Sequence, residues 1–192
     1  MKKSVYISLF AALISVGAFI QIPLPLGVPI VIQDMMAILS GFLLGPLYGS
    51  LAVLVFLVLG SIGLPVFTGK AGIQVILHGL TGGFLVGYLA AALFAGFFAV
   101  ICTKIQKSIT EKKVLSPKSG NLSLWILYSV GTVFAFAVIF SLGIFQFMRI
   151  SNSSFQKAIF AVLIPFLPGT LVKIFIIIPL AKKFRPIILN YI

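Results

Sequence analysis

The chain is a succession of long apolar runs separated by short breaks of proline, glycine or polar residues. A helix of about 20 apolar residues crosses the roughly 30 Å of hydrocarbon in a bilayer, and several runs approach that length. The pattern predicts six membrane-spanning helices, over 4–22, from about 33 to 45, over 47–63, over about 73–102, over 122–147 and from 168 to about 182. Because no stretch remains for a soluble domain, we expect an all-α integral membrane protein with one domain, residues 1–192.

Proline and glycine define the connections in the first half. Pro23, Pro25 and Pro29 cannot continue a helix, and they predict a stiff, extended first outer loop. Gly45-Pro46 predicts a tight turn between a short second helix and the third. The glycine-rich segment 64–72 predicts a second outer loop.

The second half has polar connections. The lysine-rich segment 104–120 predicts the one substantial connecting loop. A short polar connection is expected over 149–156, followed by an apolar re-entry over 157–167. Pro168 and Gly169 are then expected to open the last helix.

Composition agrees with a membrane location. The chain is 61% hydrophobic with a mean hydropathy of +1.26 and only 8% charged residues, whereas soluble domains average about 25% charged residues. The net charge of +12 does not indicate a nucleic-acid-binding protein, because the basic residues lie at the chain ends and between apolar runs. Their distribution indicates contact with a lipid bilayer instead.

The basic residues also predict the orientation in the membrane. With six spans and a cytoplasmic N-terminus, ten of the 14 basic residues fall inside and three outside, while Lys173 falls within a span. This excess follows the positive-inside rule and predicts that both termini are cytoplasmic. Lys2 and Lys3 before the first run also suit a signal peptide, but that run is long enough to span the membrane.

The lysine within the last helix is a candidate for binding. Inserting a lysine at the bilayer centre costs at least ~2.5 kcal/mol of free energy on insertion scales. Lysines are therefore rare there, and Lys173 is a candidate functional residue. A half-buried ammonium attracts a carboxylate more strongly than in water, which suits a small anionic substrate. The alternative is that Lys173 extends to the outer membrane surface.

The most unusual stretch of the sequence contains the single histidine in an apolar, glycine-rich context. Its glycines are Gly79, Gly82, Gly83 and Gly87. The four-residue spacing of Gly79, Gly83 and Gly87 favours close helix packing over ligand contact. His78 and Thr81 have two interpretations, as packing residues satisfied within the helix or as polar contacts to a ligand.

Several chemistries can be set aside. The sequence contains two acidic residues, Asp34 and Glu111, so a general acid and base pair or a metal cluster cannot be assembled. No phosphate-binding loop for ATP is present. A membrane enzyme using His78 and Lys173 therefore lacks an accompanying acid or nucleophile, and a purely structural subunit would not need the intramembrane lysine.

Five segments resemble the BioY family, the biotin-specific substrate-capture subunits, or S components, of energy-coupling factor (ECF) transporters. They are VPIVIQ (28–33), GFLLGPLYG (41–49), LGSIGLPVF (59–67), GLTGGFLVGY (79–88) and IPFLPGTLVK (164–173). The resemblance covers nearly the whole chain in order and spacing.

The resemblance implies a six-helix S component in the cytoplasmic membrane of a prokaryote. Such a subunit binds biotin from outside, catalyses nothing and needs no cofactor. It docks on a transmembrane coupling protein and two ATPase subunits, and Ser8 and Ala12 match the first-helix motif that meets the coupling protein. An S component for another small vitamin or a biotin precursor is the alternative.

The resemblance also implies part of the binding site. Gln33, Thr81, Gly82, Gly83, Thr170 and Lys173 stand at positions of the family motifs. We expect Asp34, Phe67, His78 and Tyr88 to complete the site. Lys173 matches the closing motif of the family, but Thr170 stands where the family has an aspartate. Leu80 and Val31 also depart from the family pattern. We therefore expect that Asp34, or His78 with Thr170, takes over part of the role of the missing aspartate.

Overall fold

The computed structural model describes residues 2–23, 28–112 and 117–191. In chain order its elements are α1 (Lys2–Gly17), β1 (Gln21–Ile22), β2 (Ile30–Val31), α2 (Gln33–Leu44), α3 (Pro46–Ser61), α4 (Ile73–His78), α5 (Gly82–Lys112), α6 (Pro117–Ser151), α7 (Phe155–Ala158), the π-helical segment η1 (Ile159–Leu163) and α8 (Ile164–Leu189). The two short strands pair antiparallel. The predicted all-helical class is confirmed.

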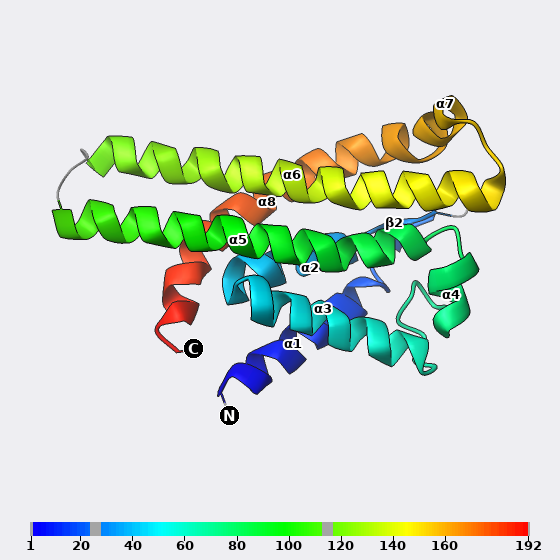
Figure 1. Ribbon diagram of the computed structural model, residues 1–192, viewed down its shortest axis with the longest axis horizontal. Coiled ribbons are helices and arrows are strands. Elements are labelled where there is room, and N and C mark those ends of the chain that lie inside the picture. The colour runs from blue at the N-terminus through cyan, green and yellow to red at the C-terminus, as the bar shows by residue number, and fades with distance from the viewer. Residues whose placement is uncertain (1, 24–27, 113–116, 192) are drawn as a thin grey trace.

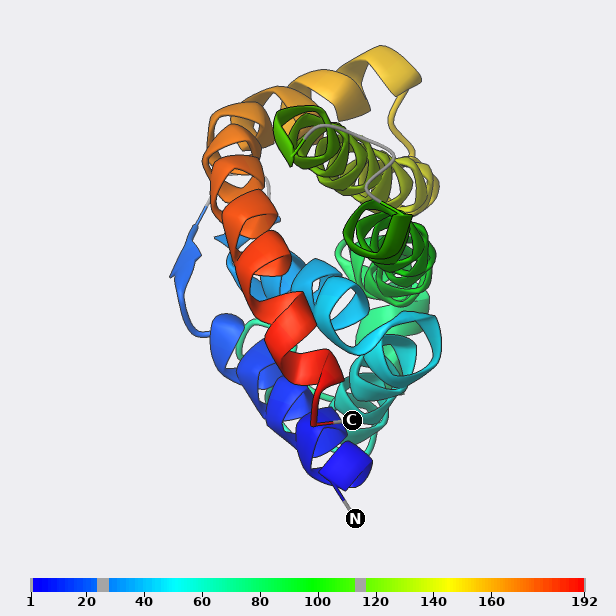
Figure 2. The ribbon, with the colours of Figure 1, turned by 90° about the vertical axis from the view of Figure 1, so that its left-hand side faces the viewer.

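Helix α2 forms the centre of the molecule. The long helices α5 and α6 lie side by side and antiparallel, while α8 crosses the bundle on another face (Figures 1 and 2). α2 contacts α1, α3, α5 and α8, and all but one of its residues are buried. The chain termini lie on the side where α5 ends and α6 begins, whereas α4, α7 and the strands lie at the opposite end (Figure 1).

The break between α2 and α3 follows the sequence prediction. Gly45 has φ +87°, which L side chains rarely adopt, and Pro46 begins α3. Gly41 lies against the backbone of Ala92 in α5, and Gly49 lies against the backbone of Gly41. A glycine at these positions allows the two short helices and α5 to approach closely.

The predicted first helix is too long. α1 ends at Gly17, and residues 21–22 form β1 instead. Gln21 pairs with Val31 and Ile22 with Ile30, so the backbone groups beyond the helix are satisfied by a strand rather than by a further helical turn. The predicted first outer loop is thus flanked by two paired strands, and its Pro25 lies outside the described residues.

The predicted fourth helix is interrupted. α4 ends at His78, Gly79 has extended backbone with ψ 148°, and α5 begins at Gly82. The side-chain amide of Gln146 donates from α6 to the carbonyl oxygens of Ile76, at 2.8 Å, and Gly79, at 2.9 Å. These bonds satisfy carbonyls that a continuous helix would pair internally, and they stabilise the break.

Two predicted breaks are helical. α5 continues to Lys112 and α6 begins at Pro117, so most of the expected loop 104–120 is helix. Lysine is a good helix former, and the polarity of this segment does not end the helix. α8 begins at Ile164 and contains Pro168, and η1 joins it to the preceding α7, so the apolar re-entry and the last helix form one helical run.

Arg185 of α8 is a buried cation. Its Nη1 atom donates to the carbonyl oxygens of Phe42, at 2.7 Å, and Leu43, at 3.1 Å, and its Nε atom donates to the Thr103 hydroxyl at 3.1 Å. These carbonyls belong to the last turn of α2, where helical carbonyls lack internal partners and a cation is favourable. Arg185 therefore joins α8 to the end of α2.

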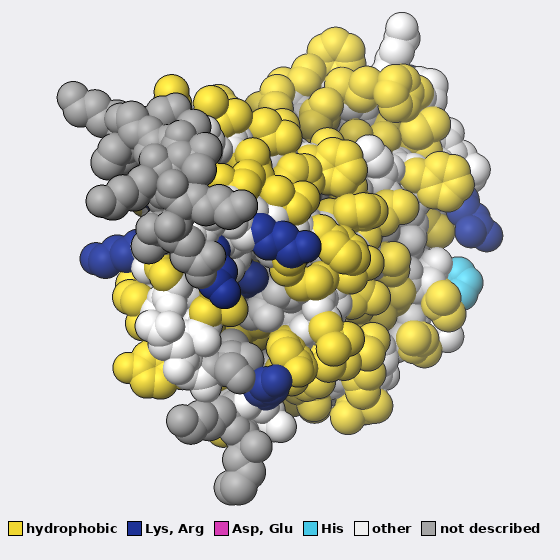
Figure 3. Space-filling view, turned by 60° about the vertical axis from the view of Figure 1, so that its left-hand side comes forward, with side chains coloured by type: hydrophobic (Ala, Val, Ile, Leu, Met, Phe, Trp, Pro, Cys, Tyr) yellow, Lys and Arg dark blue, Asp and Glu magenta, His cyan; other side chains and the backbone are white. Residues whose placement is uncertain are grey.

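The surface is that of a membrane protein. By length and apolar composition, 82–108, 121–151 and 155–189 are long enough to cross a membrane, whereas α1, α2 and α3 are apolar but shorter. Apolar side chains cover the middle of the molecule in Figure 3, with most of the visible basic side chains at one end and the histidine at the opposite edge. The apolar surface matches a lipid environment.

Packing of α5 on α6 gives a stability prediction. A methyl group added at Gly83 would overlap the carbonyl oxygen of Leu142 in α6. We expect Gly83→Ala to lower the free energy of unfolding by about 1–3 kcal/mol, measured by thermal unfolding in detergent. Gly169→Ala is the control, because its methyl would lie 3.4 Å from Cγ2 of Ile30, an ordinary contact. Equal destabilisation by both substitutions would contradict the packing role of Gly83.

Candidate substrate-binding site

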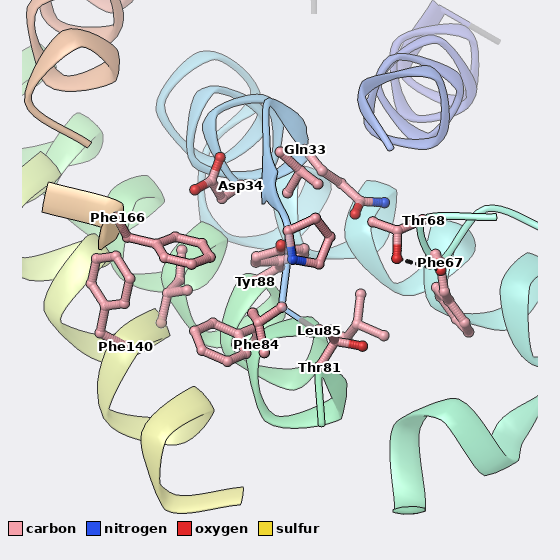
Figure 4. Close-up of a pocket in the computed structure, with 14 residues that line it drawn as sticks. Gln33, Asp34, Phe67, Thr68, Thr81, Phe84, Leu85, Tyr88, Phe140 and Phe166 are labelled. Atoms are coloured by element: carbon pink, nitrogen blue, oxygen red, sulfur yellow. Dashed lines mark hydrogen bonds between the residues drawn. The ribbon is translucent and has the colours of Figure 1, made fainter. Parts of the chain in front are cut away.

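An enclosed cavity lies at the end of the molecule that carries the strands and α4 (Figure 4). Five parts of the chain line it: the segment from Val28 to Asp34, the turn after α3, the start of α5, the middle of α6, and the start of α8. Its lining residues are Val28, Pro29, Val31, Gln33, Asp34, Phe67, Thr68, Thr81, Phe84, Leu85, Tyr88, Ile139, Phe140 and Phe166. Most of the wall is apolar, with a few polar groups on it, as in sites for small molecules.

One wall of the cavity is aromatic. Phe84 of α5 is stacked with Phe166 of α8 at 6.3 Å between ring centroids, and Phe140 of α6 meets both rings edge-on at 6.4 and 6.0 Å. The Phe84 ring lies where any side chain at Gly143 would be, so this glycine makes room for it. The three rings form a rigid apolar surface that suits a flat or fused ring.

The polar residues that line the cavity include Gln33, Asp34 and Tyr88 (Figure 4). Gln33 is only 1% exposed, and its side-chain amide donates to the carbonyl oxygen of Val66 at 3.1 Å. This bond joins the start of α2 to the turn after α3. Tyr88 is also buried, and its ring adds to the lining from α5.

Asp34 and Lys173 form a buried ion pair between α2 and α8. The Lys173 Nζ atom lies 2.8 Å from Oδ1 and 2.7 Å from Oδ2 of Asp34, and both side chains are less than one-tenth exposed. The backbone N–H of Met35 also donates to Oδ1 at 2.7 Å. Lys173 does not extend to the membrane surface, because its charge is neutralised inside the protein.

Thr170 lies one helical turn before Lys173 and is also buried. Its hydroxyl has no hydrogen-bond partner among the residues that the structure describes. The carboxylate that accompanies Lys173 therefore comes from α2 and not from position 170 on its own helix.

The structure brings together half of the binding residues expected from the sequence. Gln33, Asp34, Phe67, Thr81 and Tyr88 line the cavity. Lys173 lies behind Asp34, where it also borders an apolar groove between the strands and α8.

Besides Lys173 and Thr170, three expected residues lie outside the cavity lining: His78, Gly82 and Gly83. His78 is exposed and lines a separate pocket near the turn after α3. Gly82 and Gly83 lie against the side chain of Gln146 and, for Gly83, the carbonyl oxygen of Leu142. Both glycines therefore make room for close packing against neighbouring segments.

Sequence reasoning missed part of the aromatic wall and of the polar turn. Phe140 and Phe166 were not expected, and Thr68 next to Phe67 also lines the cavity. Phe166 lies within the family motif 164–173, which is a signal that could have found it. Phe140 is one of 19 phenylalanines in the chain and stands in no motif.

The cavity is contracted. Its free volume is about 30 Å³, room for one or two water molecules, whereas sites for small organic ligands occupy about 300–1,000 Å³. The ring of Phe67 is 1% exposed and packs edge-on against Phe56 at 5.5 Å, beneath Gly60. A ligand of several rings therefore requires the turn that carries Phe67, or the strand segment opposite, to move outward.

A helical membrane domain with a cavity of this composition at one end defines a membrane protein that binds a small solute. The fold and motifs identify it further: the chain belongs to the BioY family, whose model matches residues 1–190.

Curated relatives and a solved structure agree. The chain is 33% identical over 185 residues to the biotin transporter BioY of Thermotoga maritima, with 96% of each chain covered. It is 36% identical over 184 residues to the biotin transporter BioY of Rhodobacter capsulatus, covering 91% of this chain and 88% of that one. The crystal structure of an S component for biotin from an ECF-type ABC transporter superposes with a TM-score of 0.80 at 27% identity, covering 96% and 91% of the two chains.

The ion pair gives a second stability prediction. Breaking a buried pair leaves an uncompensated charge, which costs about 3–5 kcal/mol. We expect Asp34→Asn and Lys173→Gln each to lower the free energy of unfolding by about that amount. The decrease in the double variant should be much smaller than the sum of the two single decreases. The measurement is a double-mutant cycle from unfolding in detergent. Additive losses would show that the two side chains do not interact.

Proposed function

We propose that the chain takes up biotin as the substrate-binding S component of an ECF-type transporter. The observation that carries this proposal is the match over 96% of the chain to a solved S component for biotin, with a TM-score of 0.80. The names of the relatives support the same substrate. Binding and release are the whole activity of such a subunit, which is not an enzyme.

The cavity fits the two parts of the biotin ring system. The thioether ring is apolar and suits the wall of Phe84, Phe140 and Phe166. The ureido ring has N–H donors and a carbonyl acceptor, and the cavity offers it the carboxylate of Asp34 and the hydroxyl of Tyr88. A buried charged acceptor gives a hydrogen bond of about 1.5–3 kcal/mol.

Asp34 takes the place of the aspartate that the family motif has at position 170. Its carboxylate is held by Lys173, the lysine that matches the family, so the pair of charges is kept although one partner has moved to α2. The buried Thr170 hydroxyl next to it stays as a further polar group of the site. This substitution reconciles the altered motif with biotin as the substrate.

The same proposal includes six membrane spans, with both termini in the cytoplasm of a prokaryote. The excess of basic residues at one end supports it. Both termini also lie on the side of the molecule where α5 ends and α6 begins (Figure 1). The cavity lies at the opposite end and would then open to the outside. The short helices α1, α2 and α3 would supply the remaining spans as one membrane domain.

Transport requires partners that hydrolyse ATP. We infer that the chain docks on a transmembrane coupling protein with two ATPase subunits, and that reorientation of the whole subunit releases biotin inside. Ser8 and Ala12 are both exposed on α1, between large exposed residues such as Val5 and Leu9. Small residues on an exposed apolar helix allow another helix to approach closely.

Equilibrium binding of labelled biotin to the purified protein tests the substrate. We expect selective binding that desthiobiotin weakens by competition and that thiamine and riboflavin do not. Asp34→Asn should weaken binding at least about fivefold, since a loss of ~1 kcal/mol or more is expected for a charged hydrogen bond.

A relocated carboxylate is the matched control for that variant. Thr170→Asp combined with Asp34→Asn returns a carboxylate to the helix of Lys173, and we expect it to recover most of the lost affinity. Absence of biotin binding by folded wild-type protein would exclude biotin, and binding of one of the competitors instead would indicate another vitamin.

Tryptophan at Ser8 or Ala12 tests the partner face. We expect either variant to bind biotin as the wild type does, but to lose most biotin uptake in cells that also produce the coupling protein and the ATPases. Val133→Trp is the control, because Val133 is 54% exposed on α6, away from α1. Normal uptake by both α1 variants would argue against this docking face.

A further inference from the structure

A second pocket adjoins the cavity on the side of α4. Its volume is about 310 Å³, and its polar lining consists of Lys70, Gln74, His78 and Thr81. Thr81 lines both this pocket and the inner cavity, so the two spaces are neighbours at this residue. Of these four polar residues only Thr81 also lines the inner cavity, so a ligand confined to that cavity does not account for the other three.

A tight turn fixes the position of Lys70 relative to the inner cavity. Phe67 and Lys70 exchange backbone hydrogen bonds in both directions, each at 3.0 Å. Thr68 and Gly69 between them have φ +52° and +81°. Phe67 and Thr68 line the inner cavity, whereas Lys70, two residues on, lines the second pocket. The same turn therefore borders both spaces.

The charges of the site favour placing an anion in the second pocket. In the inner cavity the ammonium of Lys173 is already neutralised by Asp34, and the Asp34 carboxylate repels a second carboxylate. Lys70 is exposed, and the structure shows no ion pair for it among the described residues. Its charge is available to a ligand.

The neighbouring side chains add hydrogen-bond donors. The Nδ1 atom of His78 lies 2.8 Å from Oε1 of Gln74. Because an amide oxygen only accepts, Nδ1 donates this bond and leaves the amide N–H groups of Gln74 free to donate. His78 thus acts as a positioning residue for Gln74, and the hydroxyl of Thr81 is a further donor at the boundary of the two spaces.

We propose that the second pocket binds the carboxylate of the substrate. This inference rests on the proposed function, because it assumes that the ring system of biotin occupies the inner cavity. The aliphatic chain would then pass Thr81, and the carboxylate would meet Lys70 and Gln74. Lys70 is thereby a specificity-determining residue that distinguishes the free acid from its neutral derivatives.

The test compares biotin with its neutral primary amide on three proteins. The variants are Lys70→Gln and, as the matched control, Lys157→Gln, an exposed lysine that lines a different surface pocket. We expect the wild type and Lys157→Gln to bind biotin about tenfold more tightly than the amide, because a charge-assisted hydrogen bond lowers the Kd about tenfold or more. Lys70→Gln should bind both ligands with the weaker affinity.

Thermal unfolding of the three proteins checks that the variants are folded, since both lysines are exposed. Equal affinities of the wild type for acid and amide, or a Lys70→Gln variant that keeps the tenfold preference, would overturn the carboxylate site while leaving biotin capture intact. Absence of binding of either ligand to the wild type would overturn the proposed function and this assignment together. The two failures are therefore distinguishable.

Discussion

The ion pair between Asp34 and Lys173 is the interaction on which the rest of the site depends. Two opposite charges are buried where water cannot solvate them, so each is tolerated only in contact with the other. The pair fixes α8 against the start of α2, while Arg185 fixes the same helix against the last carbonyls of α2. Helix α8 thus contacts both ends of the central helix, and the contact at its start holds Gln33 and Asp34 at the cavity.

Glycine determines how closely the other helices surround α2. Gly41 and Gly49 bring α2, α3 and α5 into backbone contact, and Gly83 does the same for α5 and α6. Large aromatic side chains such as Phe84 and Phe166 instead line the cavity. Close helix packing at glycines and an apolar cavity wall of aromatic rings therefore occur in the same bundle.

Features that depend on local chemistry could be predicted from the sequence. The turn at Gly45-Pro46, the start of α2 at Gln33 and five of the cavity residues follow from such signals. The break at Gly79 could not be predicted, because it depends on the amide of Gln146, 67 residues away. That break turns His78 out of the inner cavity. The lysine-rich sequence after the apolar part of α5 predicts a loop, but α5 continues into it because lysine is compatible with helix.

The placement of Asp34 constrains how such a site can change over generations. A chain with aspartate at both 34 and 170 would crowd two carboxylates around one ammonium, and a chain with neither would leave Lys173 bare in the membrane interior. The chain with both aspartates is less destabilised than the chain with neither, because one of two adjacent carboxylates can stay protonated. Gain of the second carboxylate before loss of the first is therefore the less costly order of substitution.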